Sequence, residues 1–158
     1  MKINQIQIAK LRIPLIRPFI TALRRTEHVE DIVVIITTDN GLLWYGSAAS
    51  TPVITGDSQA SIIGALQILA TKLLGKELTN FEELLLLVQN SLVNNTSAKA
   101  AMDIALHDLV AKQLQVPLYK FLGGGKPELK ILTTVSVKDA AEMVEDAKLF
   151  VSQGFETL

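Results

Sequence analysis

The stretch SAKAAMDIALHDLVAKQLQVPLYKFLGGG, residues 97–125, decides how the rest of the chain can be arranged. Small and apolar side chains recur in it every three or four residues, which predicts a helix with one buried face. Thr96 or Ser97 can cap this helix, and Pro117 can open a short second helix over residues 118–122, before three glycines end the region. Small residues on the buried face would let another backbone approach closely. The positions assigned to that face are Ala98, Ala101, Met102, Ala105, Leu109 and Lys112.

Composition excludes several classes of function. Of the 158 residues, 49% are hydrophobic but only 5% are aromatic, so a core must be aliphatic. The formal net charge of -1 offers no electrostatic attraction for nucleic acid or for an anionic membrane, and we exclude both as partners. The absence of cysteine excludes disulfides and thiolate chemistry. The sequence shows neither a signal peptide nor an apolar run long enough to span a bilayer, so the expected location is the cytoplasm.

The N-terminal segment is predicted to begin with a strand. Apolar residues alternate imperfectly with polar ones over residues 3–13, as in a half-buried strand. Pro14 and Pro18 are expected to force irregular chain after it, so that residues 18–26 become a loop. This loop carries apolar side chains and two adjacent arginines, which is typical of a loop that covers something.

Two further strands are predicted after this loop. Residues 29–38 are β-branched and nearly continuously apolar, residues 39–41 form a turn with a glycine, and residues 42–45 return as a third strand. The expected arrangement is a three-stranded antiparallel meander.

The periodicity then changes from two residues to 3.6, which predicts helices. Asp57 or Ser58 can cap a helix that runs to Leu74, and residues 79–82 have the spacing of a capping box before a second helix that runs to Leu92. The helix that starts at Ser97 is the third, and the short helix of residues 118–122 is the fourth. Strands followed by helices favour a segregated α+β domain over a wound α/β one.

After residue 125 the pattern becomes strand, helix and the start of another strand. Residues 129–137 are predicted to form the strand, and residues 139–142 to cap a helix that runs to Gln153 and is stopped by Gly154. Parallel strands are normally covered on both faces within a complete sheet or barrel. This last part is therefore expected to be incomplete.

Chemical motifs are few. Asp103 and His107 lie one helical turn apart, a spacing that can hold a metal, with Asp108 adjacent. Two ligands without a nearby third more often form a hydrogen-bonded pair. The triple glycine follows a helix and lacks the phosphate-binding patterns, and no serine stands in a G-x-S-x-G motif. Composition and spacing alone leave the activity undetermined.

Five segments carry a resemblance to a known family. They are PFITALR at 18–24, VITGDS at 53–58, SAKAAMDIALHD at 97–108, PLY at 117–119 with LGG at 122–124, and TTVSV at 133–137. Over all 158 residues the chain resembles the N-terminal part of the muconate-lactonizing branch of the enolase superfamily. Within that branch it is most similar to dipeptide epimerases that act on L-Ala-D/L-Glu and related dipeptides.

The resemblance implies a fold and an activity. Residues 1–125 would form an α+β capping domain, a three-stranded meander followed by a helical bundle, and residues 126–158 the first βα unit of a (β/α) TIM-type barrel. Family members bind Mg²⁺ through three carboxylates on later barrel strands and place two lysines beside the substrate α-carbon. The metal stabilises an enolate while a proton is removed, a chemistry established for the superfamily as a whole.

The resemblance also places the catalytic groups beyond these residues. The family's first catalytic lysine lies in a K-x-K motif that follows a segment like Gly154–Leu158. No catalytic residue and no metal ligand are therefore expected within the chain, which is expected to be inactive alone and to be truncated or a piece of a longer gene product. A homo-oligomer is the expected assembly.

Three residues are predicted to bind substrate. In the family the loop at residues 18–26 covers the barrel mouth, so Arg24 is expected to bind the distal carboxylate of an acidic dipeptide, because guanidinium and carboxylate can form two parallel hydrogen bonds. Thr134, at the expected C-terminal end of the first barrel strand, is the neighbouring polar contact. Thr21 lies in the same loop. Alternatively, Arg24 and Arg25 form a solvated basic pair.

One departure from the family leaves the substrate open. Relatives often have W-G-E-x-x-P after the third strand, where residues 45–50 read YGSAAS and Ser47 replaces the glutamate. Two alternatives remain at this stage. One is a cycloisomerase of the muconate or o-succinylbenzoate type, with the same fold and enolate chemistry. The other is a non-catalytic module that serves packing or subunit association.

Overall fold

The computed structural model describes residues 1–125 and 129–158, and these divide into two compact units. The first unit comprises Met1–Arg12 and Glu30–Gly124, and the second comprises Ile13–Val29 and Gly125–Leu158. The predicted division into domains 1–125 and 126–158 stays a prediction, and residues 126–128, with which the second domain was expected to begin, lie outside the described residues.

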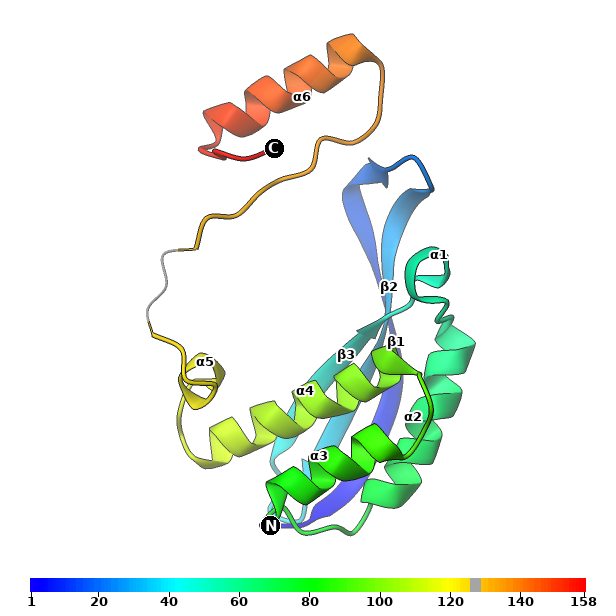
Figure 1. Cartoon of the computed structure of the whole chain (residues 1–158), viewed down its shortest axis with the longest axis vertical. Helices are drawn as coiled ribbons and strands as arrows, with labels where there is room; N and C mark the ends of the chain where they lie inside the picture. Colours follow the sequence, from blue (N-terminus) through cyan, green and yellow to red (C-terminus); the bar gives the residue numbers. More distant parts are fainter. Residues whose placement is uncertain (126–128) are drawn as a thin grey trace. The chain divides into compact units, whose positions relative to one another are not determined.

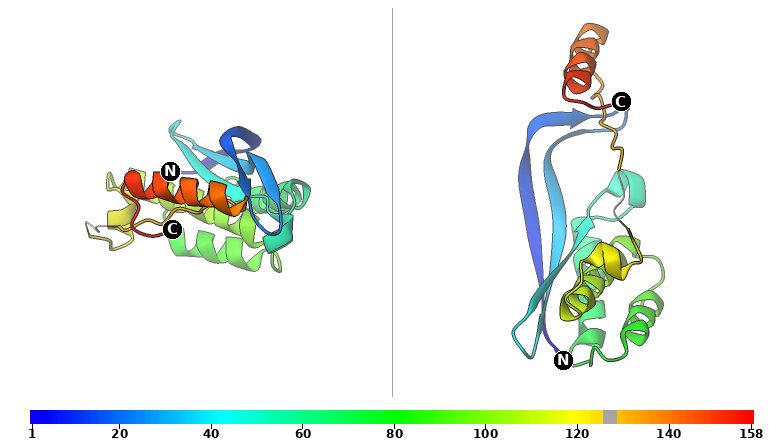
Figure 2. Two further views of the ribbon diagram at one scale, coloured as in Figure 1. Left: turned by 90° about the horizontal axis from the view of Figure 1, so that it is seen from above. Right: turned by 90° about the vertical axis from the view of Figure 1, so that its left-hand side faces the viewer.

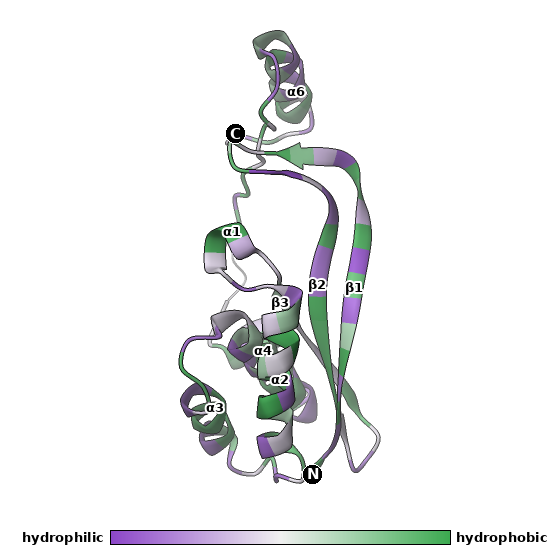
Figure 3. Ribbon diagram, turned by 90° about the vertical axis from the view of Figure 1, so that its right-hand side faces the viewer, coloured by the Kyte–Doolittle hydropathy of each residue, from purple (hydrophilic) through white to green (hydrophobic). Residues whose placement is uncertain are grey.

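The sheet is the predicted three-stranded meander. Its strands are β1 (Ile3–Ile20), β2 (Arg25–Thr38) and β3 (Leu43–Ala49), in the order β1-β2-β3. β2 and β3 pair antiparallel, with Ile35 opposite Tyr45. Hydrophobic and hydrophilic residues alternate along much of β1 in Figure 3, and fully buried residues alternate with less buried ones along residues 31–38 of β2, as expected when only one face of a sheet is covered. The fold class predicted from the sequence, an α+β capping domain, is thereby confirmed.

β1 differs from its prediction, because it runs without interruption through Pro14 and Pro18 to Ile20. The sheet order explains the difference. β1 is an edge strand, so a proline whose missing N–H faces outward removes no ladder hydrogen bond. β2 also begins earlier than predicted, and the expected loop of residues 18–26 shrinks to a turn of residues 21–24.

Three long helices lie on one side of the sheet in the first unit (Figures 1 and 2). They are α2 (Gln59–Leu73), α3 (Phe81–Asn90) and α4 (Thr96–Gln113), followed by the short α5 (Leu118–Phe121). These four were predicted, whereas the single turn α1 (Pro52–Thr55) was not. Of the long helices, α4 packs on β3, and α3 packs on α4 and α2. Within the described ranges 1–125 and 129–158, no helix is long and apolar enough to cross a membrane.

α4 is the central helix of this unit and packs directly on β3. Its buried residues are Ala98, Ala101, Met102, Ala105, Leu106, Leu109 and Ala111. The prediction that Lys112 shares this face is wrong, because Lys112 is exposed and its Nζ binds Asp108 Oδ2 at 2.7 Å. A charged ammonium stays in water unless a buried partner compensates it.

Two of the four predicted helix caps are wrong, and Asp139 stands at the predicted N-cap of the helix Ala140–Ser152 without a capping hydrogen bond from its side chain. Ser58 caps α2 as predicted, in a reciprocal pair with Ser61. α3 begins after Asn80, whose amide donates to Glu83 Oε2, and Thr79 takes no part in a cap. α4 begins after Asn95, a residue with a left-handed φ of 52°, so Thr96 and Ser97 lie inside the helix.

Asp57 supplies the missing acceptor at the start of α4. Its Oδ2 accepts hydrogen bonds from Ser97 Oγ at 2.6 Å and from the Ser97 backbone N–H at 3.4 Å. A carboxylate here satisfies an unpaired backbone donor and complements the positive end of the helix dipole. Asp57 therefore ties the segment before α2 to the first turn of α4.

We expect Asp57→Ala to lower the free energy of unfolding by about 1 kcal/mol, as loss of a helix cap does. Urea denaturation followed by circular dichroism measures this change. Asp108→Ala, within α4, is a matched control, since it removes an exposed ion pair and should cost under about 0.5 kcal/mol. Equal losses in the two variants would show that Asp57 acts only as a surface charge.

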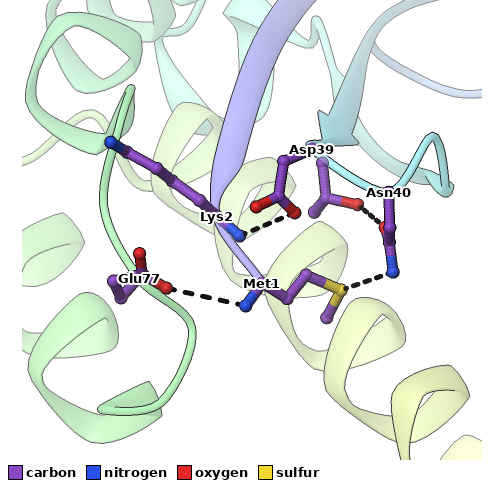
Figure 4. A network of polar contacts seen from close by, with 6 residues as sticks. Met1, Lys2, Asp39, Asn40 and Glu77 are labelled. Carbon is purple, nitrogen blue, oxygen red and sulfur yellow. Dashed lines mark hydrogen bonds and ion pairs between the residues drawn. The ribbon is translucent and has the colours of Figure 1, made fainter.

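The chain's first residues are fixed at the sheet edge (Figure 4). The Met1 α-ammonium lies 3.6 Å from Glu77 Oε2, and the Lys2 backbone N–H donates to Asp39 Oδ1 at 3.1 Å. The Asn40 amide contacts Met1 Sδ at 3.5 Å and also accepts from the Thr38 hydroxyl through its oxygen. These contacts join the start of β1 to the β2–β3 turn and to the segment after α2, which keeps an edge strand from fraying.

The described residues of the second unit contain one helix, α6 (Ala140–Ser152), as predicted. The strand predicted at residues 129–137 does not form. Only an isolated parallel bridge joins Leu132 to Thr157, with the Thr133 N–H donating to the Thr157 carbonyl at 3.2 Å. A strand needs a ladder of partners, and residues 155–158 offer too short a neighbour to pair with nine residues.

Candidate functional site

A pocket of about 710 Å³ lies within the second unit. Its walls come from the end of β1, the start of β2, residues 134–138 and α6. The apolar part of the lining includes Pro18, Phe19, Ile20 and Phe150. The charged part consists of Arg17, Arg24, Arg25, Lys138, Glu142 and Asp146. An apolar cavity with a few polar groups is the usual form of a small-molecule site.

Backbone and hydroxyl hydrogen bonds hold two walls of the pocket together. The Val137 N–H donates to the Ile20 carbonyl at 3.0 Å, and the Ile20 N–H donates to Ser136 Oγ at 3.4 Å. The last residue of β1 is thus attached to a segment more than a hundred positions later in the chain. The tip of the hairpin is fixed against residues 136–137 by these bonds.

Three of the pocket's four cations are in ion pairs. Asp146 Oδ2 binds Lys138 Nζ at 2.7 Å, and its Oδ1 lies 3.8 Å from Arg17 Nη1. The Asp146 side chain is only 17% exposed, so these pairs are less screened than surface pairs. Arg25 Nε binds Glu27 Oε1 at 3.0 Å, and both of these side chains are exposed. Their charges are largely compensated within the protein.

Arg24 is different. Its side chain lines the pocket and is half-buried, yet among residues 1–125 and 129–158 its guanidinium has no ion pair or hydrogen bond. Partial burial of an uncompensated guanidinium is costly unless a ligand supplies the partner. The geometry therefore leaves Arg24 available for an anion in the pocket.

The three predicted substrate-binding residues are placed differently. Arg24 and Thr134 line the same pocket, so the structure brings these two together. Thr21 is not part of the described lining, and its hydroxyl accepts the backbone N–H groups of Leu23 and Arg24, each at 3.3 Å. All three assignments stay predictions, since substrate contact is not shown for any of them.

Lys138, Asp146 and Arg17 were missed by sequence reasoning. Arg17 and Asp146 are far apart in the sequence, and the spacing of Lys138 to Asp146 spans a helix start, so no periodic pattern connects them. The family resemblance indicated the segment of residues 133–137. Lys138 follows this segment directly, and Asp146 lies in α6. Only the fold reveals the cluster.

The other candidate pair, Asp103 and His107, lies in the first unit and is structural. His107 Nδ1 lies 2.9 Å from Asp103 Oδ1, and its ring makes edge contacts with Phe81 and Phe121 at centroid distances of 4.9 and 6.2 Å. In the parts of the chain that the structure describes, no three His, Cys, Asp or Glu side chains gather as a metal site would require. The pair joins α3, α4 and α5 by packing.

A family model described as the N-terminal domain of mandelate racemase and muconate lactonizing enzyme matches residues 3–123. The chain belongs to this family. The match covers the meander and the helices α1 to α5, so the family assignment rests on the fold of the first unit together with the hairpin. It confirms the resemblance to the enolase superfamily that the sequence motifs indicated.

Two curated relatives within the family are dipeptide epimerases. L-Ala-D/L-Glu epimerases of Clostridium acetobutylicum and Bacillus subtilis are each 44% identical to the chain over 159 residues and match its whole length. The match covers 44% and 43% of those two proteins, so the chain spans less than half the length of the curated relatives.

Solved structures agree with this comparison. A substrate-liganded complex of the L-Ala-D/L-Glu epimerase from Bacillus subtilis superposes with a TM-score of 0.92 over 98% of this chain and 44% of that one. A dipeptide epimerase from Cytophaga hutchinsonii, complexed with Mg and D-Ala-L-Val, gives a TM-score of 0.91 at 32% identity, over 99% of this chain and 43% of that one.

Proposed function

We propose that the chain is the N-terminal portion of a Mg²⁺-dependent dipeptide epimerase of the L-Ala-D/L-Glu type. Such an enzyme inverts the configuration of an α-carbon by removing its proton and stabilising the resulting enolate. The relatives at 44% identity support this class of reaction. The observation that carries the choice of an acidic dipeptide is the half-buried Arg24, which has no protein partner among the described residues.

The proposal assigns substrate binding, and not proton transfer, to these residues. Mg²⁺ would supply the positive charge that stabilises the enolate. The described residues offer no group of three ligands for the ion, so they do not fit its site. Under this proposal, the metal ligands and the catalytic lysines belong to the portion of the relatives that the chain does not span.

Arg24 and Thr134 would bind the distal end of the substrate. A side-chain carboxylate of the dipeptide would accept two hydrogen bonds from the Arg24 guanidinium, and Thr134 is exposed and lines the same pocket. Phe19 and Phe150 in the lining would reduce the local water content, which strengthens a guanidinium–carboxylate pair. Asp146 already compensates Arg17 and Lys138, so those cations would compete less for the substrate.

The charge of Arg24 also separates this proposal from related activities. Relatives at 33% identity include L-Lys-D/L-Arg epimerases of Desulforapulum autotrophicum and Methylococcus capsulatus, whose names give cationic substrates. An unpaired guanidinium would repel a cationic side chain.

A cycloisomerase of the muconate or o-succinylbenzoate type and a non-catalytic module remain the alternatives. The homo-oligomeric state and cytoplasmic location stay predictions.

The gene product of full length is expected to exchange the α-proton of L-Ala-L-Glu with D₂O in a Mg²⁺-dependent manner, and residues 1–158 alone are expected to show no exchange. Proton NMR of the dipeptide, with and without EDTA, measures both. Residues 1–158 should be inactive because they contain no candidate Mg²⁺ site among the described residues.

Three results would contradict this assignment. Exchange by residues 1–158 alone would show that a complete site lies within them. Conversion of a muconate or of the o-succinylbenzoate precursor, without dipeptide exchange, would identify the cycloisomerase alternative. A full-length product inactive on both classes of substrate would favour the non-catalytic module.

A further inference from the structure

The turn that carries Arg24 is closed by one side chain, that of Thr21. The Thr21 Oγ accepts the backbone N–H groups of Leu23 and Arg24, each at 3.3 Å. The Thr21 backbone N–H donates to the Arg24 carbonyl at 2.9 Å, and its hydroxyl lies 3.5 Å from the same carbonyl. Both backbone polar groups of Arg24 are therefore bound to Thr21.

Packing offers little help in fixing this turn. Leu23 is 74% exposed, and Ala22 between it and Thr21 is exposed as well. The preceding residue, Ile20, is attached to Ser136 and Val137, so the turn starts from a fixed point. From that point to Arg24, the conformation depends on the hydrogen bonds of Thr21, because a threonine hydroxyl can close a turn by binding the backbone two and three residues ahead.

We propose that Thr21 is a positioning residue, which fixes the Arg24 guanidinium in the pocket for the distal carboxylate of an acidic substrate. This inference rests on the proposed function and replaces the direct substrate contact predicted for Thr21 from the sequence. A two-point guanidinium–carboxylate contact depends on orientation, and a displacement of about 1 Å can cost a large part of such an interaction. Thr21 acts on selectivity through Arg24 and does not touch the substrate.

Thr21→Val tests the inference, because valine keeps the shape and β-branching of threonine and removes the hydroxyl. In the full-length enzyme we expect the ratio of kcat/KM for L-Ala-L-Glu to that for L-Ala-L-Phe to fall about tenfold, as expected for the loss of one or two net hydrogen bonds. Thr21→Ser keeps the hydroxyl and should restore the ratio to within about threefold of wild type. Thr79→Val, at an exposed threonine of the first unit, is the matched control and should leave the ratio unchanged.

A double-mutant cycle shows whether Thr21 acts through Arg24. If it does, Thr21→Val should lower the ratio no further in an Arg24→Ala background, because the group that it positions is gone. A full additional loss in that background would indicate a direct contact between Thr21 and substrate and would overturn the inference. Equal losses on the acidic and the neutral dipeptide would also overturn it, since these indicate only a weaker fold.

A measurement that needs no catalytic turnover distinguishes a failure of this inference from a failure of the proposed function. Hydrogen exchange, measured by mass spectrometry on a peptide that covers residues 20–26, should be faster in Thr21→Val than in wild type or Thr21→Ser. Unchanged exchange in an active enzyme would overturn the positioning role alone. A wild-type enzyme inactive on dipeptides would overturn the proposed function, and with it the substrate assigned to Arg24, whatever the exchange shows.

Discussion

Gly46→Ala is expected to destabilise the first unit by about 3 kcal/mol, because β3 and α4 meet there backbone to backbone. A Cβ on Gly46 would lie 1.9 Å from the Ala101 carbonyl oxygen and 2.9 Å from its carbonyl carbon. Neither group is the end of a flexible side chain. The strand and the central helix would have to separate, which would disturb the packing of Trp44 and Ala48 on the same buried face of β3.

Urea denaturation of the chain measures this loss, and Gly64→Ala provides the matched control. Gly64 lies inside α2, and a Cβ there would meet nothing within 4 Å. Alanine should raise stability at this helix position by about 0.5–1 kcal/mol, since glycine is the poorer helix former. The same substitution is thus expected to have opposite signs at the two sites. A Gly46→Ala variant as stable as wild type would show that β3 and α4 are not in close contact.

The close contact at Gly46 was predictable from the sequence on the side of the helix but not on the side of the strand. The small residues at Ala98, Ala101 and Ala105 predicted that some backbone approaches this face of the helix, and they are indeed buried. The sequence could not identify the strand, because the partner lies 55 positions before Ala101 and its only signal is a glycine. The periodicity of a segment shows which face of its helix or strand is buried. Which two faces pack together depends on the tertiary structure.

The two wrong strand predictions also arose because tertiary neighbours could not be read from the local sequence. The prolines of β1 were expected to end the strand, but an edge position removes the cost of a missing N–H. Residues 129–137 were predicted as a strand from their composition, yet only the bridge from Leu132 to Thr157 forms. In both places the outcome depends on whether a neighbouring strand is present, and a local pattern does not contain that information.

The candidate site was predictable only in part. The resemblance to the family indicated Arg24 and Thr134, and the structure places both in one pocket. The ion pairs of Asp146 with Lys138 and Arg17 join three separate segments, so no motif could predict them. Together with the pair of Arg25 and Glu27, these pairs distinguish Arg24 from the other pocket cations, and the distinction leads to the prediction with the largest expected effect on activity.

Arg24→Ala is expected to lower kcat/KM for L-Ala-L-Glu about 100-fold in the full-length enzyme, and that for L-Ala-L-Phe by less than about threefold. The reason is the half-buried position of Arg24, where the substrate carboxylate would be its partner. Removing one member of a desolvated, hydrogen-bonded charge pair costs roughly 2–5 kcal/mol, and about 2.7 kcal/mol corresponds to a hundredfold. Initial rates of epimerisation on the two dipeptides provide the measurement.

Arg25→Ala distinguishes this role from that of a solvated basic pair. Arg25 is adjacent and exposed, and its guanidinium already binds Glu27, so its loss should change the acidic-to-neutral ratio by less than about fivefold. Arg24→Lys should fall between wild type and alanine, because lysine keeps the charge and loses the two-point geometry. Equal effects of Arg24→Ala and Arg25→Ala would indicate that both arginines act only through the general positive potential of the hairpin tip. In that case another group in the pocket would have to recognise the carboxylate, and Lys138, which lines the pocket and whose ion pair with Asp146 would then have to open, is a candidate by its charge.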